Sequence, residues 1–420
     1  MIELINKLKE RAMLVAVQTR HVNRELVEEH LSELEELADT AGADSIFKII
    51  QSKSSIDPAF YIGKGKAEEL AQLVELNEID LVISDDDLTP VQVRNLERLF
   101  NRKIIDRSGL ILDIFALRAK TKEAKTQVEL AQLEYMLPRL TRAWTHLSKQ
   151  YGGIGTKGPG ETQIETDRRM IRTRISHLKE KLKDIESQRQ TQSKGRKDFI
   201  RISIAGYTNA GKSTLFNLLT KADVFAEDKL FATLDSTTRT INFDKEKILV
   251  SDTVGFIRKL PAHLVASFKS TLNEVRESDI ILHMIDLSHP YYEDHLRVVE
   301  ETLKDFGSQH KKEIKVFNKV DSVTDKSIIE YVRNKFPGSV IISAMKGINI
   351  TSLVKSIDNV IKDSFIEQEL TLGIEQTKLA SQIHDLAEVT SVKYDHDNVV
   401  FKFRANKENS EKINKLIAKY

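Results

Sequence analysis

The pattern G-x-x-x-x-G-K-S at Gly206–Ser213 constrains this chain more than any other feature of its sequence. It stands between an apolar run, Arg201–Ala205, and a helical pattern that starts near Lys212, so a strand, a loop and a helix are expected. Gly206 and Gly211 let such a loop turn its backbone N–H groups toward phosphate oxygens, to which the helix N-terminus adds its positive dipole end. Lys212 is placed to reach the β- and γ-phosphates, and Ser213 to offer a hydroxyl to Mg²⁺. A purely structural glycine turn is the alternative, and the strand–loop–helix context disfavours it.

Three further signals follow in a fixed order, each directly after an apolar run that predicts a strand. They are Asp252-Thr253-Val254-Gly255 after Ile248–Val250, Asn318-Lys319-Val320-Asp321 after Ile314–Phe317, and Ser343-Ala344-Met345-Lys346 after Val340–Ile342. In doubly wound α/β sheets, ligands bind at the carboxyl ends of the strands. The four ordered motifs therefore predict one nucleotide site at one edge of a mostly parallel sheet.

The chemistry of these motifs favours GTP over ATP. Asp252 can hold the magnesium shell, and the Gly255 amide can meet the γ-phosphate. The carboxylate of Asp321 can accept both N–H donors of the guanine edge, whereas adenine would leave it unpaired. Lys319 can lie along the base and Asn318 can tie its loop to the phosphate loop. A backbone amide in the Ser343 motif can bond guanine O6.

Two features between these motifs leave choices open. The segment Phe231–Arg239 is placed as switch I, and Thr233, Thr237 and Thr238 compete to complete the Mg²⁺ coordination. Phe256 stands where many small GTPases carry a glutamine that orients the attacking water. Either Phe256 is only a core residue and another group catalyses, or intrinsic turnover is slow and is completed by a partner or a rearranged switch; we favour the second. Asn209 is either a ligand of a bound monovalent cation or a loop-stabilising hydrogen-bond donor.

The rest of the chain predicts further domains, since 420 residues correspond to two to four domains of about 150 residues. Residues 1–117 alternate helical patterns with short apolar runs, which predicts an α/β domain with a largely parallel sheet. Residues 118–197 predict an antiparallel helical hairpin, with helices over Leu117–Gln150 and Glu165–Gln188 and a glycine-rich loop at 151–161. Residues 198–364 form the expected nucleotide-binding domain. Residues 365–420 form a small α/β tail with a strand at Asn398–Phe403 and a basic final helix.

Charge and composition narrow the partners and the compartment. Residues 118–201 hold 20 Lys and Arg against 10 Asp and Glu, a local excess that indicates a polyanionic partner; a solvated helical surface is the alternative. The chain has no cysteine, which excludes a disulfide framework, thiolate metal sites and a cysteine nucleophile, and fits a reducing compartment. No apolar stretch approaches the ~20 residues of a membrane span, and the N-terminus does not read as a signal peptide. A cytoplasmic protein with no membrane span is expected.

At this point the sequence resembles the HflX-type ribosome-associated GTPases. The resemblance covers nearly the whole chain: the nucleotide motifs carry it, together with Phe60–Lys66, Ile104–Ala119 and Gly152–Arg169. It implies a P-loop GTPase domain preceded by an N-terminal α/β domain and a helical hairpin. It also implies that Thr233 is the magnesium-binding threonine of switch I, that residues 231–235 line the nucleotide, and that a phenylalanine at position 256 is normal. Ser236 departs from the family, which usually carries proline there.

The resemblance completes the expected site. Lys212, Thr233 and Gly255 act on the reacting phosphate, and Ser213 and Thr233 bind Mg²⁺. The residues expected to bind GTP are Gly206, Tyr207, Thr208, Asn209, Ala210, Gly211, Lys212, Ser213, Phe231, Ala232, Thr233, Leu234, Asp235, Asp252, Thr253, Val254, Gly255, Asn318, Lys319, Val320, Asp321, Ser343, Ala344 and Met345.

The implied partner is the large ribosomal subunit, or the 70S ribosome, bound by a protein that is a monomer when free. The candidates for contact with ribosomal RNA are Lys149, Gly152, Gly153, Lys157, Gly158, Arg168, Arg169 and Arg172. Glycines allow close approach to RNA, and arginines engage phosphates or stack on bases. The alternative is that this loop is only an exposed connector.

The implied activity is GTP hydrolysis stimulated by ribosomes, with splitting or rescue of stalled ribosomes under stress. A different class of function stays open: an RNA-binding or subunit anti-association factor that uses GTP only to lock a conformation. A GTPase that modifies tRNA is disfavoured, because no reactive cysteine is present for one-carbon chemistry.

Overall fold

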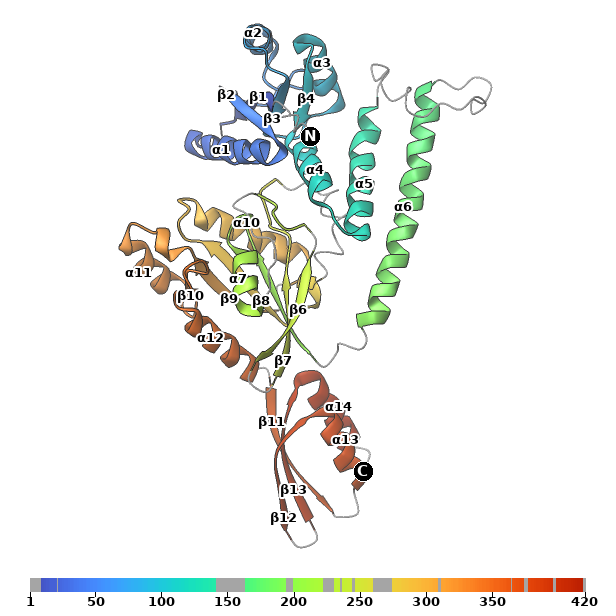
Figure 1. Ribbon diagram of the computed structural model, residues 1–420, viewed down its shortest axis with the longest axis vertical. Helices are drawn as coiled ribbons and strands as arrows, with labels where there is room; N and C mark the ends of the chain where they lie inside the picture. Colours follow the sequence, from blue (N-terminus) through green and yellow to red (C-terminus); the bar gives the residue numbers. More distant parts are fainter. Residues whose placement is uncertain are drawn as a thin grey trace, which may run out of the picture. The chain divides into compact units, whose positions relative to one another are not determined.

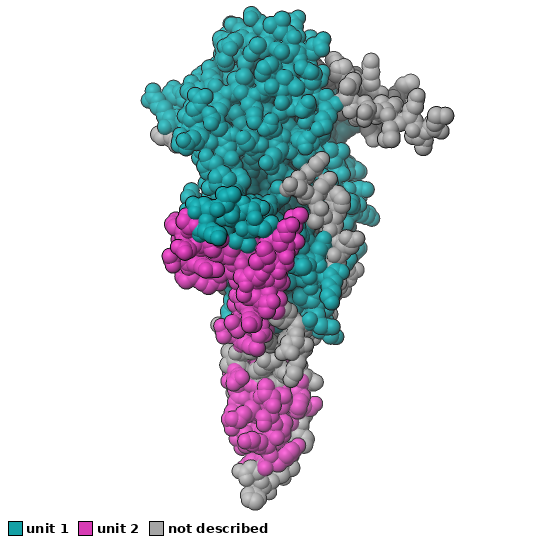
Figure 2. Space-filling view, turned by 60° about the vertical axis from the view of Figure 1, so that its left-hand side comes forward, with its two compact units in different colours: residues 1–326 teal, residues 327–420 magenta. Residues whose placement is uncertain are grey.

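The computed structural model of the chain consists of two compact units, residues 1–326 and residues 327–420, which Figure 2 colours separately. Figure 1 shows the order of helices and strands along the chain. The structure describes residues 9–20, 22–140, 163–193, 199–221, 230–234, 236–243, 246–259, 274–308, 311–363, 365–373, 377–395 and 398–417.

The first part of residues 1–326 is a four-stranded parallel sheet in the order β2-β1-β3-β4. Its elements are β1 (Glu10–Gln18), α1 (Arg24–Ala41), β2 (Ala43–Ser52), α2 (Lys64–Leu76), β3 (Leu81–Ser84), α3 (Pro90–Phe100), β4 (Lys103–Asp106) and α4 (Arg107–Arg118). Alternate residues of β1 enter two different cores: Leu14 packs with α1 and α4, whereas Met13 and Val15 pack with α2 and α3. Burial on both faces explains why these strands read as apolar runs in the sequence.

Helix α3 is absent from the sequence prediction, although the chain carries a clear start signal for it. Pro90 occupies the first helical turn, and the side chains and backbones of Thr89 and Gln92 form a reciprocal capping box. Leu96 and Phe100 lie on the inner face of the helix and are buried in the core. Helix α3 thus completes the second helical layer of the sheet.

The first helix of the predicted hairpin is shorter than expected. Instead of one helix from Leu117 to Gln150, α5 (Lys122–Met136) begins after the cap residue Thr121, and a 3₁₀ turn, η1 (Leu137–Arg139), follows it. Pro138 lies in that turn, and proline lacks the N–H that a continuing α-helix needs. The returning helix α6 (Gln163–Ser193) packs its Ile175 and Leu178 against α5. Figure 1 shows the two helices side by side.

The predicted doubly wound, mostly parallel sheet is confirmed in the second part of the unit. Its strands and helices are β5 (Ile200–Gly206), α7 (Lys212–Thr220), β6 (Thr237–Phe243), β7 (Glu246–Asp252), β8 (Ile280–Asp286), α10 (Tyr292–Asp305), β9 (Lys312–Asn318) and the 3₁₀ turn η4 (Val320–Ser322). The strands lie in the order β9-β8-β5-β7-β6, and only β6 runs antiparallel to its neighbour. The carboxyl ends of β5, β7 and β9 therefore meet at one edge.

Residues 327–420 hold a helix–strand–helix segment and a small antiparallel sheet. Its elements are α11 (Lys326–Lys335), β10 (Val340–Ile341), α12 (Ile350–Lys362), β11 (Phe365–Gly373), α13 (Thr377–Leu386), β12 (Glu388–Asp395), β13 (Asn398–Asn406) and α14 (Lys407–Ile417). The sheet order is β11-β13-β12, and Phe401, Phe403, Ile383 and Ile413 form its core with the two helices. The sequence predicted only the central strand of the three. Among the described residues of the whole chain, no helix has the length and apolarity to cross a membrane.

Candidate nucleotide-binding site

The loop between β5 and α7 has no room for side chains at its two glycines. A Cβ on Gly206 would lie 2.3 Å from the carbonyl oxygen of Met284, and one on Gly211 would lie 2.3 Å from Nδ2 of Asn318. Gly211 also has a φ of 90°, which L-residues rarely adopt. Both glycines are therefore required by the close approach of neighbouring strands.

Lys212 lies buried at the start of α7. Its Nζ donates a hydrogen bond of 2.7 Å to the carbonyl oxygen of Tyr207. Burial lowers the pKa of Lys212 to about 8, while the nearby carboxylate of Asp252 opposes that shift. The ammonium group of Lys212 can therefore exchange its hydrogen bond to the Tyr207 carbonyl for hydrogen bonds to phosphate oxygens.

Three oxygen-bearing side chains converge beside Lys212. Ser213 Oγ lies 2.8 Å from Oγ1 of Thr233 and donates to Oδ2 of Asp252 at 2.7 Å, and Thr233 lies 3.3 Å from the same carboxylate oxygen. Asp252 is fully buried, and its other oxygen, Oδ1, has no hydrogen-bond partner among the described residues. Burial raises the pKa of Asp252. Two hydroxyls and an under-satisfied buried carboxylate fit a small, hard divalent cation such as Mg²⁺.

The threonines that competed for this role are separated by the structure. Thr233 lies beside Ser213, whereas Thr237 and Thr238 open strand β6, where Thr238 Oγ1 lies 2.9 Å from Oγ of Ser251. The segment after D-x-x-G pairs with the phosphate loop. The Phe256 amide donates to Gly206 O at 3.0 Å, and Phe256 O accepts from Thr208 N at 2.7 Å.

The Phe256 side chain is only 2% exposed and packs in the core cluster. It is thus a core residue, and in this arrangement it offers no polar group to a water molecule. The loop, switch I and Gly255 together line a cavity of about 60 Å³. Thr214, the last residue of the string GKST, also lines it and was missed in the sequence analysis; its place directly after the motif was the available signal.

The N-K-x-D motif follows β9 and meets the phosphate loop. Asn318 Nδ2 donates to the carbonyl oxygen of Ala210 at 2.9 Å, which joins the two motifs. Lys319 adopts a φ of 62°, and its Nζ pairs with Asp286 at 2.7 Å. Asp321 lies in the 3₁₀ turn η4 with its side chain exposed, so its carboxylate is accessible to a guanine base.

The fourth motif lies in residues 327–420. Ser343 is buried, exchanges two backbone hydrogen bonds with Ile348, and accepts a bond from the Lys346 amide through its Oγ. These bonds form a tight loop in which Met345 is 79% exposed. The part of Ser343, Ala344 and Met345 in base recognition stays a prediction from the sequence.

Several predicted site residues lie outside the described residues. They are Asp235 of switch I and the RNA candidates Lys149, Gly152, Gly153, Lys157 and Gly158. The remaining RNA candidates, Arg168, Arg169 and Arg172, lie on α6. Arg168 donates to the carbonyl oxygen of Leu140 at 3.0 Å, so it also closes the hairpin.

Comparisons with known proteins agree with this geometry. Three family models match the chain: "GTP-binding GTPase N-terminal" over residues 28–116, "GTP-binding GTPase Middle Region" over 118–196, and "50S ribosome-binding GTPase" over 201–319. The relative named GTPase HflX of Flavobacterium psychrophilum is 51% identical over 313 residues, 74% of this chain and 76% of its own. That of Escherichia coli is 42% identical over 89% of this chain and 88% of its own.

A crystal structure of a GTP-binding protein from Sulfolobus solfataricus in complex with GDP is 26% identical to this chain. It matches 84% of this chain and 99% of its own length with a TM-score of 0.43.

Proposed function

The chain belongs to the HflX family of GTPases, and we propose that it binds the large ribosomal subunit, alone or in the 70S ribosome, and hydrolyses GTP under the influence of that partner. GTP binding and GTPase activity come with the family. The observation that carries the catalytic part is the convergence of Ser213, Thr233 and Asp252 beside Lys212. The ribosomal part is supported by the matched model, whose description is "50S ribosome-binding GTPase".

The reaction is an in-line attack of water on the γ-phosphorus, which breaks the bond to the β–γ bridging oxygen and leaves GDP and phosphate. In our assignment, Lys212 neutralises charge on the β- and γ-phosphate oxygens, and the Gly255 amide donates to a γ-phosphate oxygen. Ser213 and Thr233 would hold Mg²⁺, and Asp252 accepts hydrogen bonds from both hydroxyls. When bound, Mg²⁺ neutralises charge that develops on the phosphates.

Among the described residues we assign no group that orients the attacking water. Phe256 is buried and apolar, so slow intrinsic turnover is expected, with completion by the ribosome or by a rearranged switch. Asn209, with a φ of 60° in the phosphate loop, is a candidate ligand for a monovalent cation that would add charge there. A loop-stabilising role for Asn209 is the alternative.

Guanine recognition is assigned to Asp321 with Asn318, Lys319 and the loop that starts at Ser343. Contact with ribosomal RNA is assigned to the hairpin, through Arg168, Arg169 and Arg172 and the glycine-rich loop before them. A protein that works on ribosomes is placed in the cytoplasm, and we propose that it is a monomer when free. We propose that the result of this activity is the splitting or rescue of stalled ribosomes.

The deciding experiment measures two quantities on the full chain. Co-sedimentation with 50S subunits is compared between GDP and a non-hydrolysable GTP analogue, and multiple-turnover hydrolysis is compared with and without 50S subunits. Binding that requires the analogue, together with faster turnover on 50S subunits, supports the proposal. Binding without stimulation would favour the alternative, an RNA-binding or anti-association factor that GTP only switches. No binding to 50S subunits with either nucleotide would contradict both.

A further inference from the structure

One side chain of the phosphate loop, that of Tyr207, contacts the N-terminal α/β region. The hydroxyl of Tyr207 donates to Oε1 of Glu33 on α1, and the same hydroxyl accepts from the Arg258 backbone N–H at 3.0 Å. Tyr207 and Glu33 are 4% and 7% exposed. A residue of the phosphate loop, a residue that follows D-x-x-G and a carboxylate far earlier in the chain thus share one buried contact.

Glu33 lies at the centre of a network of charges. Its Oε2 pairs with Arg107 and lies 3.5 Å from Nε of Arg258, and Arg107 also donates to Asp85 at 2.8 Å. Burial raises the pKa of Tyr207, so the phenol keeps its proton and remains a donor to the carboxylate. Removal of one member of such a buried network leaves its partners uncompensated.

Lys259, the residue after Arg258, makes a second contact to the N-terminal α/β region. Lys259 Nζ lies 2.5 Å from Asp85 and 2.6 Å from Asp86, directly after β3. Arg258 and Lys259 follow Gly255 by three and four residues. The segment that carries the Gly255 amide is therefore held at its far end by three carboxylates: Glu33, Asp85 and Asp86.

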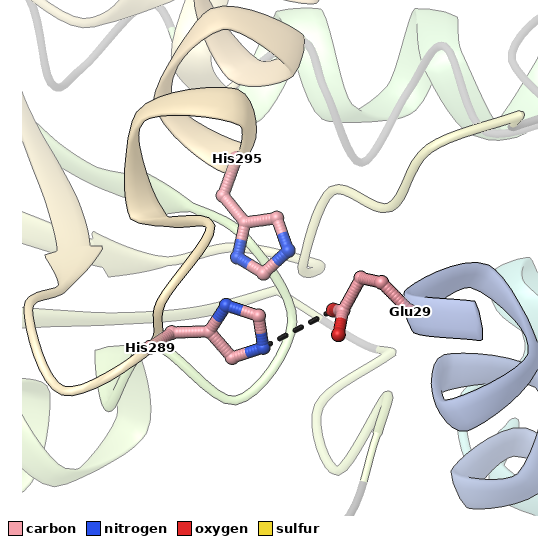
Figure 3. Close-up of side chains that lie close together, drawn as sticks. All are labelled: Glu29, His289 and His295. Carbon is pink, nitrogen blue, oxygen red and sulfur yellow. Dashed lines mark ion pairs between the residues drawn. The ribbon is translucent and has the colours of Figure 1, made fainter. Parts of the chain in front are cut away.

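A third contact involves Glu29, one helical turn before Glu33 on α1. Figure 3 shows Glu29 facing His289, with His295 beside them. Glu29 pairs with Nε2 of His289 at 3.2 Å, and His295 stacks on the ring of Tyr207 at 3.8 Å. Glu29, His289 and His295 have the composition of a metal site. However, Nδ1 of His289 accepts from the Tyr291 amide at 3.1 Å, so Nε2 carries the proton and has no lone pair to give. The three residues therefore join α1 to α10 and to the loop before α10, and they do not form a metal centre.

These contacts occur while switch I and the segment from Gly255 that leads to Arg258 and Lys259, here called switch II, both lie against the phosphate loop. Thr233 reaches Ser213, and Phe231, Thr233 and Gly255 line one cavity with Lys212. The backbone of Phe256 is bonded to Gly206 and Thr208. The arrangement that presents the Gly255 amide to a γ-phosphate is thus the arrangement in which Arg258 and Lys259 are held.

From this we propose that Glu33 is a positioning residue that sets the preference of the site for GTP over GDP, acting through Tyr207 and Arg258. GTP needs switch II in place, because its γ-phosphate is met by Gly255, whereas GDP binds whether switch II is held or released. If the network is lost, the competent state is populated less, and the apparent affinity for GTP falls by that fraction. The inference rests on the proposed role of Gly255.

The test compares the affinities of the full chain for GDP and for a non-hydrolysable GTP analogue. The variants are Glu33→Gln, Tyr207→Phe, which keeps the ring that stacks on His295, and Asp86→Asn, which loosens Lys259. The matched control is Glu35→Gln, because Glu35 also lies on α1 but pairs with the exposed Lys48. Thermal unfolding reports whether each variant is folded.

We expect the affinity for the analogue to fall about tenfold in Glu33→Gln and Tyr207→Phe, within the usual range of coupling between sites. We expect a smaller fall in Asp86→Asn, and affinities for GDP within about twofold of the parent in Glu33→Gln, Asp86→Asn and the control Glu35→Gln. Equal losses for both nucleotides would show a merely structural role, and unchanged analogue affinity in folded Tyr207→Phe would also overturn the proposal. If Lys212→Ala kept both affinities, the phosphate site itself would be misassigned, which is a separate failure.

Discussion

Lys212 shows at the residue scale how burial prepares a cation for phosphate. Its pKa of about 8 is set by burial, against the attraction of Asp252. Phosphates bind the charged form, so we expect GDP affinity to be level below pH 8 and to fall by about tenfold per pH unit above it, one proton being taken up on binding. Titrations between pH 7 and 9.5 measure this. Lys212→Met should bind weakly and without this pH dependence; a flat profile for the parent would contradict the assignment.

Gly211 illustrates a position where only glycine fits. Alanine there combines a φ of 90° with a Cβ 2.3 Å from Asn318 Nδ2. Strain of about 1–3 kcal/mol at such a position predicts a loss of GDP affinity of tenfold or more in Gly211→Ala. Gly338→Ala is the control, since Gly338 also has a positive φ of 83° but open space around it. It should lose some stability and no nucleotide affinity; equal nucleotide loss in both variants would argue against the close-packing explanation.

Asp321 carries the base preference in our assignment. Asparagine at this position presents an amide donor, which complements the carbonyl that xanthine has in place of the guanine 2-amino group. We expect Asp321→Asn to lose at least tenfold in GTP affinity and to gain affinity for xanthosine triphosphate. Competition titrations with both nucleotides measure the exchange. Retained GTP affinity together with indifference to xanthosine triphosphate would place the base elsewhere.

At the scale of elements, the sequence predicted the helices and strands that a single local pattern specifies. Strands buried on both faces, such as β1 and β5, stood out as apolar runs, and the nucleotide motifs fell at strand ends as expected. The apolar period from Val128 to Leu140 suggested one long helix, but Pro138 ends the α-helical hydrogen bonding. Strand β11 carries the polar run Glu367-Gln368-Glu369, and Glu is a weak strand former, so packing on β13 decided its state.

The network around Glu33 could not be foreseen from the sequence. No local pattern indicates that Tyr207 and Glu33, 174 residues apart, share a hydrogen bond. Similarly, Lys259 gave no sign that it would reach Asp85 and Asp86. Long-range pairing of charged side chains depends on how whole elements pack, and single-residue propensities carry no information about it.

Helix α3, which the sequence did not predict, offers a test of its capping box. Thr89→Ala removes the hydroxyl of its capping box and should destabilise the helix by about 1 kcal/mol. Hydrogen exchange of the first amides of α3 should then quicken about fivefold. Thr40→Ala is the control, because the Thr40 hydroxyl only bonds back to Glu36 O within α1 and does not cap. Equal exchange in the parent and Thr89→Ala would show that Pro90 alone defines the start.

At the scale of the larger unit, both switches contact the N-terminal region. Phe231 of switch I packs edge-on against Phe115 of α4 at 4.7 Å, and Arg258 after switch II meets Glu33 of α1. Helix α4 leads into α5 within four residues, and α5 packs on α6. A partner that engages the hairpin therefore has a continuous packed route to the switches, without a direct contact with the nucleotide.

The last prediction uses this route. Shortening Gly152–Gly160 to a tight turn should spare intrinsic GTP hydrolysis, because this segment supplies no phosphate or base ligand in our assignment. It should remove most of the stimulation by 50S subunits, about tenfold or more, because glycines and nearby basic residues suit contact with RNA. Helix α6 has 31 residues, or about 45 Å at 1.5 Å per residue, enough to carry such a contact far from the nucleotide.

Turnover alone, turnover with 50S subunits and binding to 50S subunits should be measured for the parent, the shortened variant and an equal-length Gly/Ser replacement. The replacement keeps the reach of the loop but removes Lys157, so it should retain part of the stimulation, and its binding should depend less on salt, because one phosphate contact fewer releases fewer counterions. Equal stimulation in all three proteins would mean that the loop is only a connector. In that case the charged face of α6, with Arg169 and Arg172, would have to carry the contact with RNA.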